Sequence, residues 1–151
     1  IIRALSIREL FEYAQIFSQN KTVSVKNVAI ITNAGGPGVI ATDELVSRGL
    51  NLASLSAGTV KSLSQFLPAG ANVNNPVDIL GDAKADRFGK SLEIVEKDKG
   101  VDAISVILTP QSMTEVRKTA QEIIKVKRSS QKPIISSFMG AQNVKPGVRL
   151  M

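Results

Sequence analysis

The residues of this chain that could do chemistry gather around one glycine-rich turn. An apolar stretch over residues 28–32 runs into Asn33-Ala34-Gly35-Gly36-Pro37-Gly38, and apolar residues resume after it. Glycines let the backbone approach a ligand closely, and the first N–H groups of a helix point outward without partners and carry roughly half a positive charge. This pattern is typical of an anion site, and its candidate residues are Asn33, Gly35, Gly36 and Gly38.

Two common nucleotide sites do not fit this turn. Residues 36–41 satisfy the dinucleotide spacing G-x-G-x-x-A, but residues 54–56 are Ser-Leu-Ser where an acidic residue would hold a ribose. Pro37 also removes one N–H donor, and Gly38 is not followed by the lysine of a P-loop. Two alternatives stay open, namely glycines that serve only close helix-to-sheet packing and a free flavodoxin-type domain that binds FMN.

The composition narrows the chemistry further. The chain has no histidine and no cysteine, so it offers neither a phosphohistidine, nor the commonest general base, nor a thiolate. We therefore expect no catalytic residue and no metal site within it. Its length, with 43% hydrophobic and 21% charged residues, is that of an ordinary globular domain.

Two classes of partner are not expected. No apolar run approaches the roughly 20 residues of a membrane-spanning helix, and the start lacks a signal-peptide layout. We therefore expect a cytoplasmic protein without a membrane partner. The net charge of +6 is scattered along the chain, and one tyrosine with no tryptophan offers no stacking platform, so we expect no nucleic acid partner.

Alternating strands and helices predict the fold. The expected strands are 28–32, 50–55, 76–80, 102–108 and 132–138, and the expected helices are 6–19, 37–48, 57–67, 84–98 and one with Thr109 as N-cap and Pro110 as its first residue. Such alternation is typical of an α/β protein with a parallel sheet. Ser6-Ile7-Arg8-Glu9 has the spacing of a capping box for the first helix, Phe88, Leu92 and Val95 share one face of the helix 84–98, and the nearly continuous apolar run 102–108 is expected of a strand buried on both faces. We expect a flavodoxin-like three-layer sandwich of five parallel strands in the order 2-1-3-4-5, preceded by the leading helix.

Ligands of parallel sheets bind beyond the carboxyl ends of the strands. The loops 33–38, 81–84 and 109–114 follow strand ends and should meet there. Asp78, Gly81 and Asp82 belong to the same rim. Short aspartate side chains at strand ends usually bind nearby backbone N–H groups, although they could also orient loop amides or help to hold Mg²⁺.

Three motifs in this order resemble the NDP-forming acyl-CoA synthetases, which include the ADP-forming acetate–CoA ligases and succinyl-CoA synthetase. The motifs are Thr32 to Val39, Asn75 to Ala83 and Val106 to Thr114. The resemblance extends from the leading helix to Gly140 and is to the second flavodoxin-like, or CoA-ligase, subdomain. It implies a helix and connector at 1–27, a CoA-ligase domain at 28–140 and the truncated start of a next element at 141–151.

The resemblance also implies an activity and partners. Such an enzyme converts acyl-CoA, ADP and phosphate to the free acid, CoA and ATP through a phosphohistidine on another domain. The implied partners are the histidine-bearing flavodoxin-like domain, a CoA-binding Rossmann domain and an ATP-grasp domain of the same enzyme. The full enzyme would use CoA, ADP or ATP, Mg²⁺ and phosphate, whereas this fragment alone should bind no cofactor and be inactive.

Within this chain, the resemblance implies that the helix opened by Thr109 holds the phosphoryl group with its N-terminus. The contacting residues would be Thr109, Gln111, Ser112, Met113 and Thr114. Succinyl-CoA synthetase has two glycines at the positions of Pro110 and Gln111, so the hydroxyls of Ser112 and Thr114 could replace lost backbone donors. The alternative function is a non-catalytic regulatory or interaction domain of a synthetase-like acetyltransferase fusion.

Overall fold

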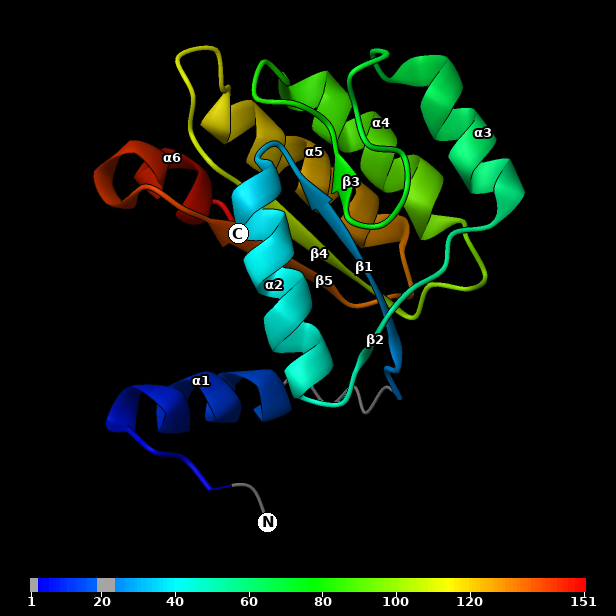
Figure 1. The fold of residues 1–151 in the computed structure, drawn as a ribbon. Coiled ribbons are helices and arrows are strands. Elements are labelled where there is room, and N and C mark those ends of the chain that lie inside the picture. The colour runs from blue at the N-terminus through cyan, green and yellow to red at the C-terminus, as the bar shows by residue number, and fades with distance from the viewer. Residues whose placement is uncertain (1–2, 19–23) are drawn as a thin grey trace.

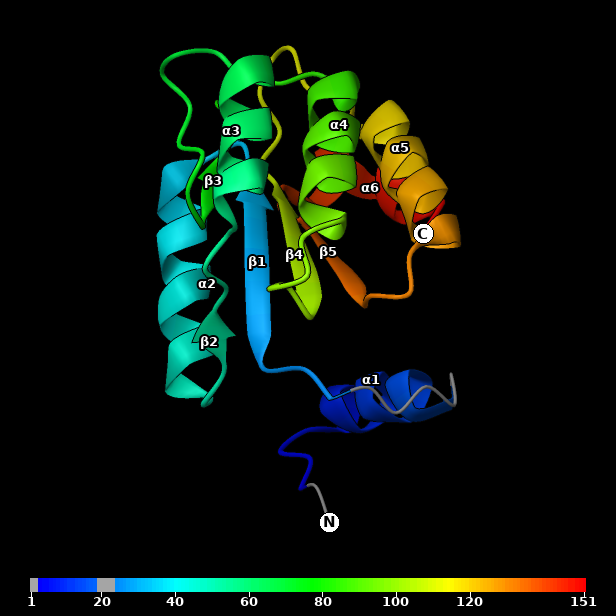
Figure 2. The same ribbon diagram turned by 90° about the vertical axis from the view of Figure 1, so that its right-hand side faces the viewer.

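The computed structural model describes residues 3–18 and 24–151. Its middle layer is a parallel sheet (Figure 1) of β1 (Asn27–Thr32), β2 (Asn51–Leu52), β3 (Val77–Asp78), β4 (Ala103–Leu108) and β5 (Ile134–Phe138). Helix α2 (Gly35–Ser47) covers one face, and α4 (Ala85–Glu96) and α5 (Val116–Ser129) cover the other, with α3 (Ala57–Phe66) beside α4 (Figure 2). The predicted α/β class with a five-stranded parallel sheet is confirmed.

Strands β1 and β4 form the centre of the sheet. They pair in parallel from Val28 opposite Ala103 to Thr32 opposite Ile107. Their nearly continuous apolar sequences suit this place, because a strand covered by helices on both faces has no polar side. Ile30 and Ile31, whose side chains point to opposite faces, are both fully buried.

The predicted place of the third strand is wrong. The observed order is β2-β1-β4-β5, and β3 pairs with β1 instead of lying between β1 and β4. β2 pairs with the first residues of β1, and β3 pairs with its last residues, Ile31 and Thr32. Strands of 2 residues each can share one edge of a 6-residue strand, but neither can separate two such strands that pair along their length.

Asn75 fills the gap between β2 and β3. Its side-chain Oδ1 accepts a hydrogen bond from Ile30 N–H at 2.8 Å. Its Nδ2 donates to Val28 O and Ala53 O, both at 2.9 Å. Because buried backbone groups require partners, this side-chain amide replaces the backbone of a strand residue as hydrogen-bond partner along this edge of β1.

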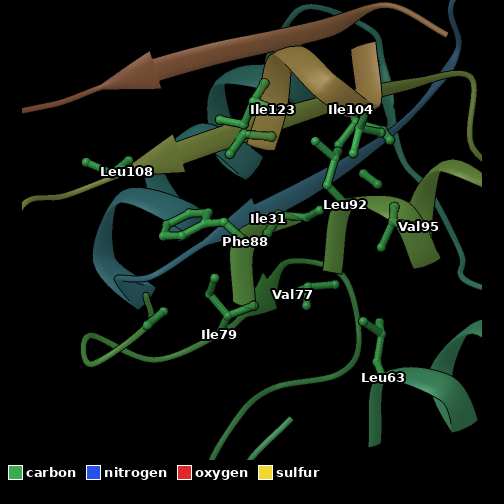
Figure 3. Close-up of a cluster of buried hydrophobic side chains, with 14 of the residues drawn as sticks. Ile31, Leu63, Val77, Ile79, Phe88, Leu92, Val95, Ile104, Leu108 and Ile123 are labelled. Carbon is green, nitrogen blue, oxygen red and sulfur yellow. The ribbon is translucent and has the colours of Figure 1, made fainter. Parts of the chain in front are cut away.

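The core lies between the sheet and the helices α3 to α5 (Figure 3). Phe88, Leu92 and Val95 form one buried face of α4, which confirms the spacing expected for this helix. Figure 3 shows these side chains directed toward Ile31 and Ile104 of the central strands. The sheet that carries the rim loops is therefore anchored to α4 by apolar packing.

The leading helix α1 (Ile7–Ser18) has the expected capping box. Glu9 N–H donates to Ser6 Oγ at 3.1 Å, and Leu5 N–H donates to the Glu9 carboxylate at 2.6 Å. The helix lies apart from the sheet, near the C-terminal end of α2 (Figure 1). Its apolar residues Leu10 and Phe11 are 57% and 70% exposed.

Residues 141–148 form a 3₁₀ helix η1 (Ala141–Val144) and a short helix α6 (Lys145–Val148). Val144 is buried in the core cluster. A Cβ on Gly147 would lie 2.8 Å from side-chain atoms of both Phe138 and Val116, so this segment packs closely on β5 and α5. The expected domain boundary at 140 stays a prediction.

The helix expected from Pro110 begins only at Val116, so that prediction is wrong. Residues 109–114 form a loop closed by local hydrogen bonds. Gln111 N–H donates to Thr114 Oγ1 at 2.8 Å, and Thr114 N–H donates to Gln111 O at 3.1 Å. A threonine hydroxyl competes in this way with the helical pattern for backbone groups, and the helix starts after it.

Candidate functional site

Three loops adjoin at the carboxyl ends of β1, β3 and β4, as expected. A Cβ on Gly81 would lie 3.7 Å from Gln111 Cγ and 3.8 Å from Asn33 O. The loops 33–38, 81–84 and 109–114 therefore meet around these residues, and we call this place the rim. The sheet positions the rim, because the loops 33–38 and 109–114 directly follow β1 and β4, and the loop 81–84 lies just beyond β3.

Asn33 joins β1 to β4 at the rim. Its Nδ2 donates to Thr109 O and its Oδ1 accepts from Thr109 N–H, both at 2.8 Å. The residue is only 2% exposed. The amide expected on the ligand side of the rim is therefore buried and hydrogen-bonded to the residue that follows β4.

The N-terminus of α2 opens onto the rim. The helix begins at Gly35 rather than at the expected Pro37, with Ala34 as an N-cap that has no side-chain acceptor. Gly35 and Gly36 are exposed, and within the described residues their N–H groups have no acceptor. Two backbone donors at the positive end of a 13-residue helix thus face outward.

Gly38 has a structural role in the same turn. A Cβ at this position would lie 3.0 Å from Thr32 Cγ2 and 3.6 Å from Pro76 Cβ, so a larger residue would push α2 away from the sheet. A Cβ on Gly36, in contrast, would meet no atom within 4 Å. The packing explanation of the glycines therefore holds for Gly38 and fails for Gly36.

Asp78 lies beside the N-terminus of α2. Its Oδ1 accepts from Leu80 N–H at 2.9 Å, which is the local backbone role expected for it. Its Oδ2 is 3.2 Å from the place of a Cβ on Gly35. The carboxylate thus holds the β3 turn and adds negative charge near the helix end.

Asp82 is engaged on the outer side of the rim. Its carboxylate forms an ion pair with Arg87, whose guanidinium also donates to Ile79 O at 3.0 Å. The hydrogen bond from Arg87 lowers the pKa of Asp82 below its ordinary value. The residue therefore stabilises its own loop through α4.

The carboxylate of Glu115 lies at the start of a second helix near the rim, α4. This residue is the N-cap position of α5, and its Oε2 accepts from Ala85 N–H at the start of α4 at 3.4 Å. The hydrogen bond from the Lys118 ammonium, together with the one from Ala85 N–H, lowers the pKa of Glu115. The Glu115 carboxylate therefore lies at the start of α4, whereas it makes no capping hydrogen bond to α5.

The loop 109–114 presents a mixed set of groups. Gln111, Ser112 and Met113 are exposed, whereas the Thr109 hydroxyl is buried without a partner among the described residues. The Thr114 hydroxyl accepts the internal hydrogen bond from Gln111 N–H. The accessible side chains of this loop are therefore those of residues 111–113.

A hollow lies at the opposite end of the sheet. It has a volume of about 600 Å³ and is lined by Ser54, Thr59, Lys97 and Lys99 among others. The Asp98 carboxylate accepts from Ser56 N–H at 2.8 Å and from Gly100 N–H at 2.9 Å, so an anion of the chain itself already lies at the start of α3. We attach no chemistry to this hollow.

Within residues 3–18 and 24–151, no group of three or more acidic side chains is placed to hold a metal ion. In the same residues, no helix is long and apolar enough to cross a membrane.

Comparison with known proteins gives one family. Residues 28–150 match the model of the Ligase-CoA domain. The chain is 39% identical over 151 residues to the ADP-forming acetate–CoA ligase I of Archaeoglobus fulgidus, across 100% of this chain and 21% of the relative. It is 42% identical over 149 residues to the ADP-forming acetate–CoA ligase of Methanocaldococcus jannaschii, across 96% of this chain and 21% of the relative.

A solved structure has the same fold. It is the dinucleotide-forming acetyl-coenzyme A synthetase 1 of Ca. Korarchaeum cryptofilum in complex with phosphate and ADP, which superposes with a TM-score of 0.89 at 26% identity. The match covers 99% of this chain and 33% of that one. The present chain thus spans about a fifth of the curated relatives' length and a third of the solved chain.

Proposed function

The chain belongs to the Ligase-CoA domain family, and we propose that it is the second flavodoxin-like subdomain of an ADP-forming acyl-CoA synthetase. The named relatives are ADP-forming acetate–CoA ligases, and each is several times longer than this chain. The remaining length has room for the histidine-bearing, Rossmann and ATP-grasp domains that the resemblance implies. This chain would supply one wall of a site completed by them.

The observation that carries the proposal is the open N-terminus of α2. Gly35 and Gly36 present N–H donors that have no acceptor among the described residues, on the same rim as the exposed side chains of residues 111–113. The resemblance calls for a helix end that holds a phosphoryl group. We assign this role to α2, because the helix after β4 begins at Val116 and not at Thr109, and Gln111 and Ser112 would supply side-chain donors from the same rim.

The proposed chemistry needs no acid or base from this chain. Phosphate attacks the thioester of acyl-CoA, which releases CoA and forms an acyl phosphate. A histidine nitrogen on the partner domain then attacks the phosphorus and the carboxylic acid leaves, after which ADP takes the phosphoryl group and becomes ATP. Backbone N–H groups fixed before the reaction stabilise the negative charge of the phosphoryl group at each step.

The described residues of this chain do not suit a Mg²⁺ site of their own. At the N-terminus of α2, the Oδ2 atom of Asp78 is the one nearby carboxylate oxygen of the described residues without a hydrogen bond, because Asp82 forms an ion pair with Arg87. Mg²⁺ in nucleotide-using enzymes is bound by one or two carboxylates together with phosphate oxygens. Mg²⁺ would therefore be bound with the nucleotide on other domains, and the proposed role of this chain does not depend on the ion.

The proposal is tested on the full enzyme incubated with ATP and Mg²⁺. We expect acid-labile phosphate on a histidine outside this segment, which has no histidine. The combined substitution Thr109→Ala, Ser112→Ala and Thr114→Ala removes the accessible Ser112 hydroxyl and the Thr114 hydroxyl that holds the loop, and it should lower the yield of phosphoenzyme. Unchanged phosphorylation in this variant and in a variant with a carboxylate at the start of α2 would refute the proposal.

A further inference from the structure

Asn33 links β1 to the loop 109–114, although it is too buried to reach a ligand. Its side chain donates to Thr109 O and accepts from Thr109 N–H, and the residue is 2% exposed. Its own carbonyl oxygen lies 3.8 Å from the place of a Cβ on Gly81. In the sequence it comes directly before Ala34, the N-cap of α2.

We infer that Asn33 is a positioning residue, which sets the distance between the open N-terminus of α2 and the loop 109–114 during phosphoryl transfer. The inference rests on the proposed function. Two hydrogen bonds to the N–H and C=O of one residue fix both the place and the orientation of Thr109 relative to β1. Small displacements of binding groups cost large factors in rate, so such a support matters even without ligand contact.

The loop has little other support at its start. Its hydrogen bonds between Gln111 and Thr114 are internal, and Pro110 packs against Gly140, where a Cβ would lie 2.6 Å from Pro110 Cγ. Beyond the last paired residues of β1 and β4, Thr32 and Ile107, the two hydrogen bonds between Asn33 and Thr109 are therefore what ties the start of this loop to the segment that leads into α2. Loss of the link should move Gln111 and Ser112 relative to Gly35 and Gly36 without removing any donor.

The substitution Asn33→Asp probes the link because aspartate has nearly the same shape. Ionised, it cannot donate to Thr109 O and instead places a second oxygen against it. Protonated, it has both an O–H donor and a carbonyl acceptor, as asparagine does. Burial raises the pKa of such a carboxyl group, so the link should return as the pH falls. The charged groups around the rim are Asp78, Lys84, the pair Asp82 and Arg87, and the pair Glu115 and Lys118.

The experiment measures the rate of phosphoenzyme formation from ATP in the full enzyme between pH 8 and pH 5.5. At each pH, the rate of the variant is divided by the rate of the wild-type enzyme. At pH 8 we expect Asn33→Asp to be about tenfold slower, with an unchanged KM for ATP, because an unpaired buried acceptor costs on the order of tenfold in an equilibrium. The ratio should rise toward one as the pH falls. A ratio that stays at one throughout, or stays low at every pH, would overturn the inference.

Asn75→Asp is the matched control. Asn75 also links neighbouring strands by its amide, but it lies away from the rim. This variant should lose stability and yet phosphorylate like wild type at temperatures where it is folded. Equal slowing in both variants would mean that Asn33 acts only through stability, which contradicts the inference.

A second measurement needs no substitution. Hydrogen exchange at Thr109 N–H in the wild-type enzyme should be slow, because its acceptor is the buried Asn33 Oδ1. Fast exchange there would overturn the inference even if Asn33→Asp does not fold. If Gly36→Asp slows phosphorylation and Asn33→Asp does not, only this inference fails. If neither substitution slows phosphorylation, the proposed function fails together with this inference.

Discussion

The substitution Gly36→Asp separates stability from function at the N-terminus of α2. A Cβ at Gly36 meets no atom within 4 Å, so the new side chain fits without rearrangement. A carboxylate in the first helical turn should stabilise the folded chain by about 0.3–1 kcal/mol relative to a neutral side chain. The same charge should oppose a phosphoryl group bound at that helix end.

The size of the opposing effect follows from Coulomb's law. A carboxylate about 6 Å from a phosphoryl group of about two negative charges is repelled by roughly 1.4 kcal/mol at the dielectric constant of water and by roughly 5.5 kcal/mol at an effective value of about 20. Because Gly36 is exposed, we take the lower figure. It corresponds to a phosphoenzyme formed at least about tenfold more slowly.

The matched control is Gly36→Asn, which has the same shape without charge. Thermal unfolding of the chain gives the stability difference, and rapid-quench labelling of the full enzyme with ATP gives the phosphorylation rate. We expect Gly36→Asp to unfold at a higher temperature than Gly36→Asn and to phosphorylate more slowly. If the temperature rises and the two rates are equal, the end of α2 does not face the phosphoryl group.

Three further predictions concern the scaffold. The lowered pKa of Glu115 contributes stability that is present above its ordinary pKa of 4.5 and is lost as the pH falls through the lower pKa of the folded chain. Glu115→Gln should therefore flatten the dependence of the unfolding temperature on pH below about 4.5, and an unchanged slope would contradict this assignment. Phe88→Ala empties a site that is 1% exposed and should cost about 3–5 kcal/mol in denaturant unfolding, whereas a cost below about 1 kcal/mol would show that α4 is not the core helix. Gly140 has φ of 126° and lies against Pro110, so Gly140→Ala should cost more than about 1 kcal/mol in the same assay, and a neutral result would contradict the packing of this loop.

Local patterns in the sequence predicted most of the elements. The capping box of α1 and the apolar face of α4 involve residues three to seven positions apart, and both are present. The apolar run of β4 indicated a strand buried on both faces of the sheet, which is also confirmed. Such patterns succeed because they depend on contacts within one element or on burial alone.

Three features of the fold and the site could not be predicted from such patterns. The start of α5 depends on the Thr114 hydroxyl, which competes with the helix that Thr109 and Pro110 favour. The carboxylate at the start of α4 depends on Glu115 meeting Ala85, and the place of β3 depends on Asn75 meeting β1. These contacts join residues 30 and 45 positions apart, so they are properties of the folded chain.

The most direct test is a structure of the full enzyme trapped with its histidine phosphorylated and in contact with this domain. The measurement is the distance from the phosphoryl oxygens to the backbone nitrogens of Gly35 and Gly36. We predict that at least one of these nitrogens lies within about 3.2 Å of a phosphoryl oxygen, with Gln111 or Ser112 on its other side. A phosphoryl group bound at this domain by other donors, with both glycine nitrogens more than about 6 Å away and so beyond hydrogen-bond reach, would contradict the account.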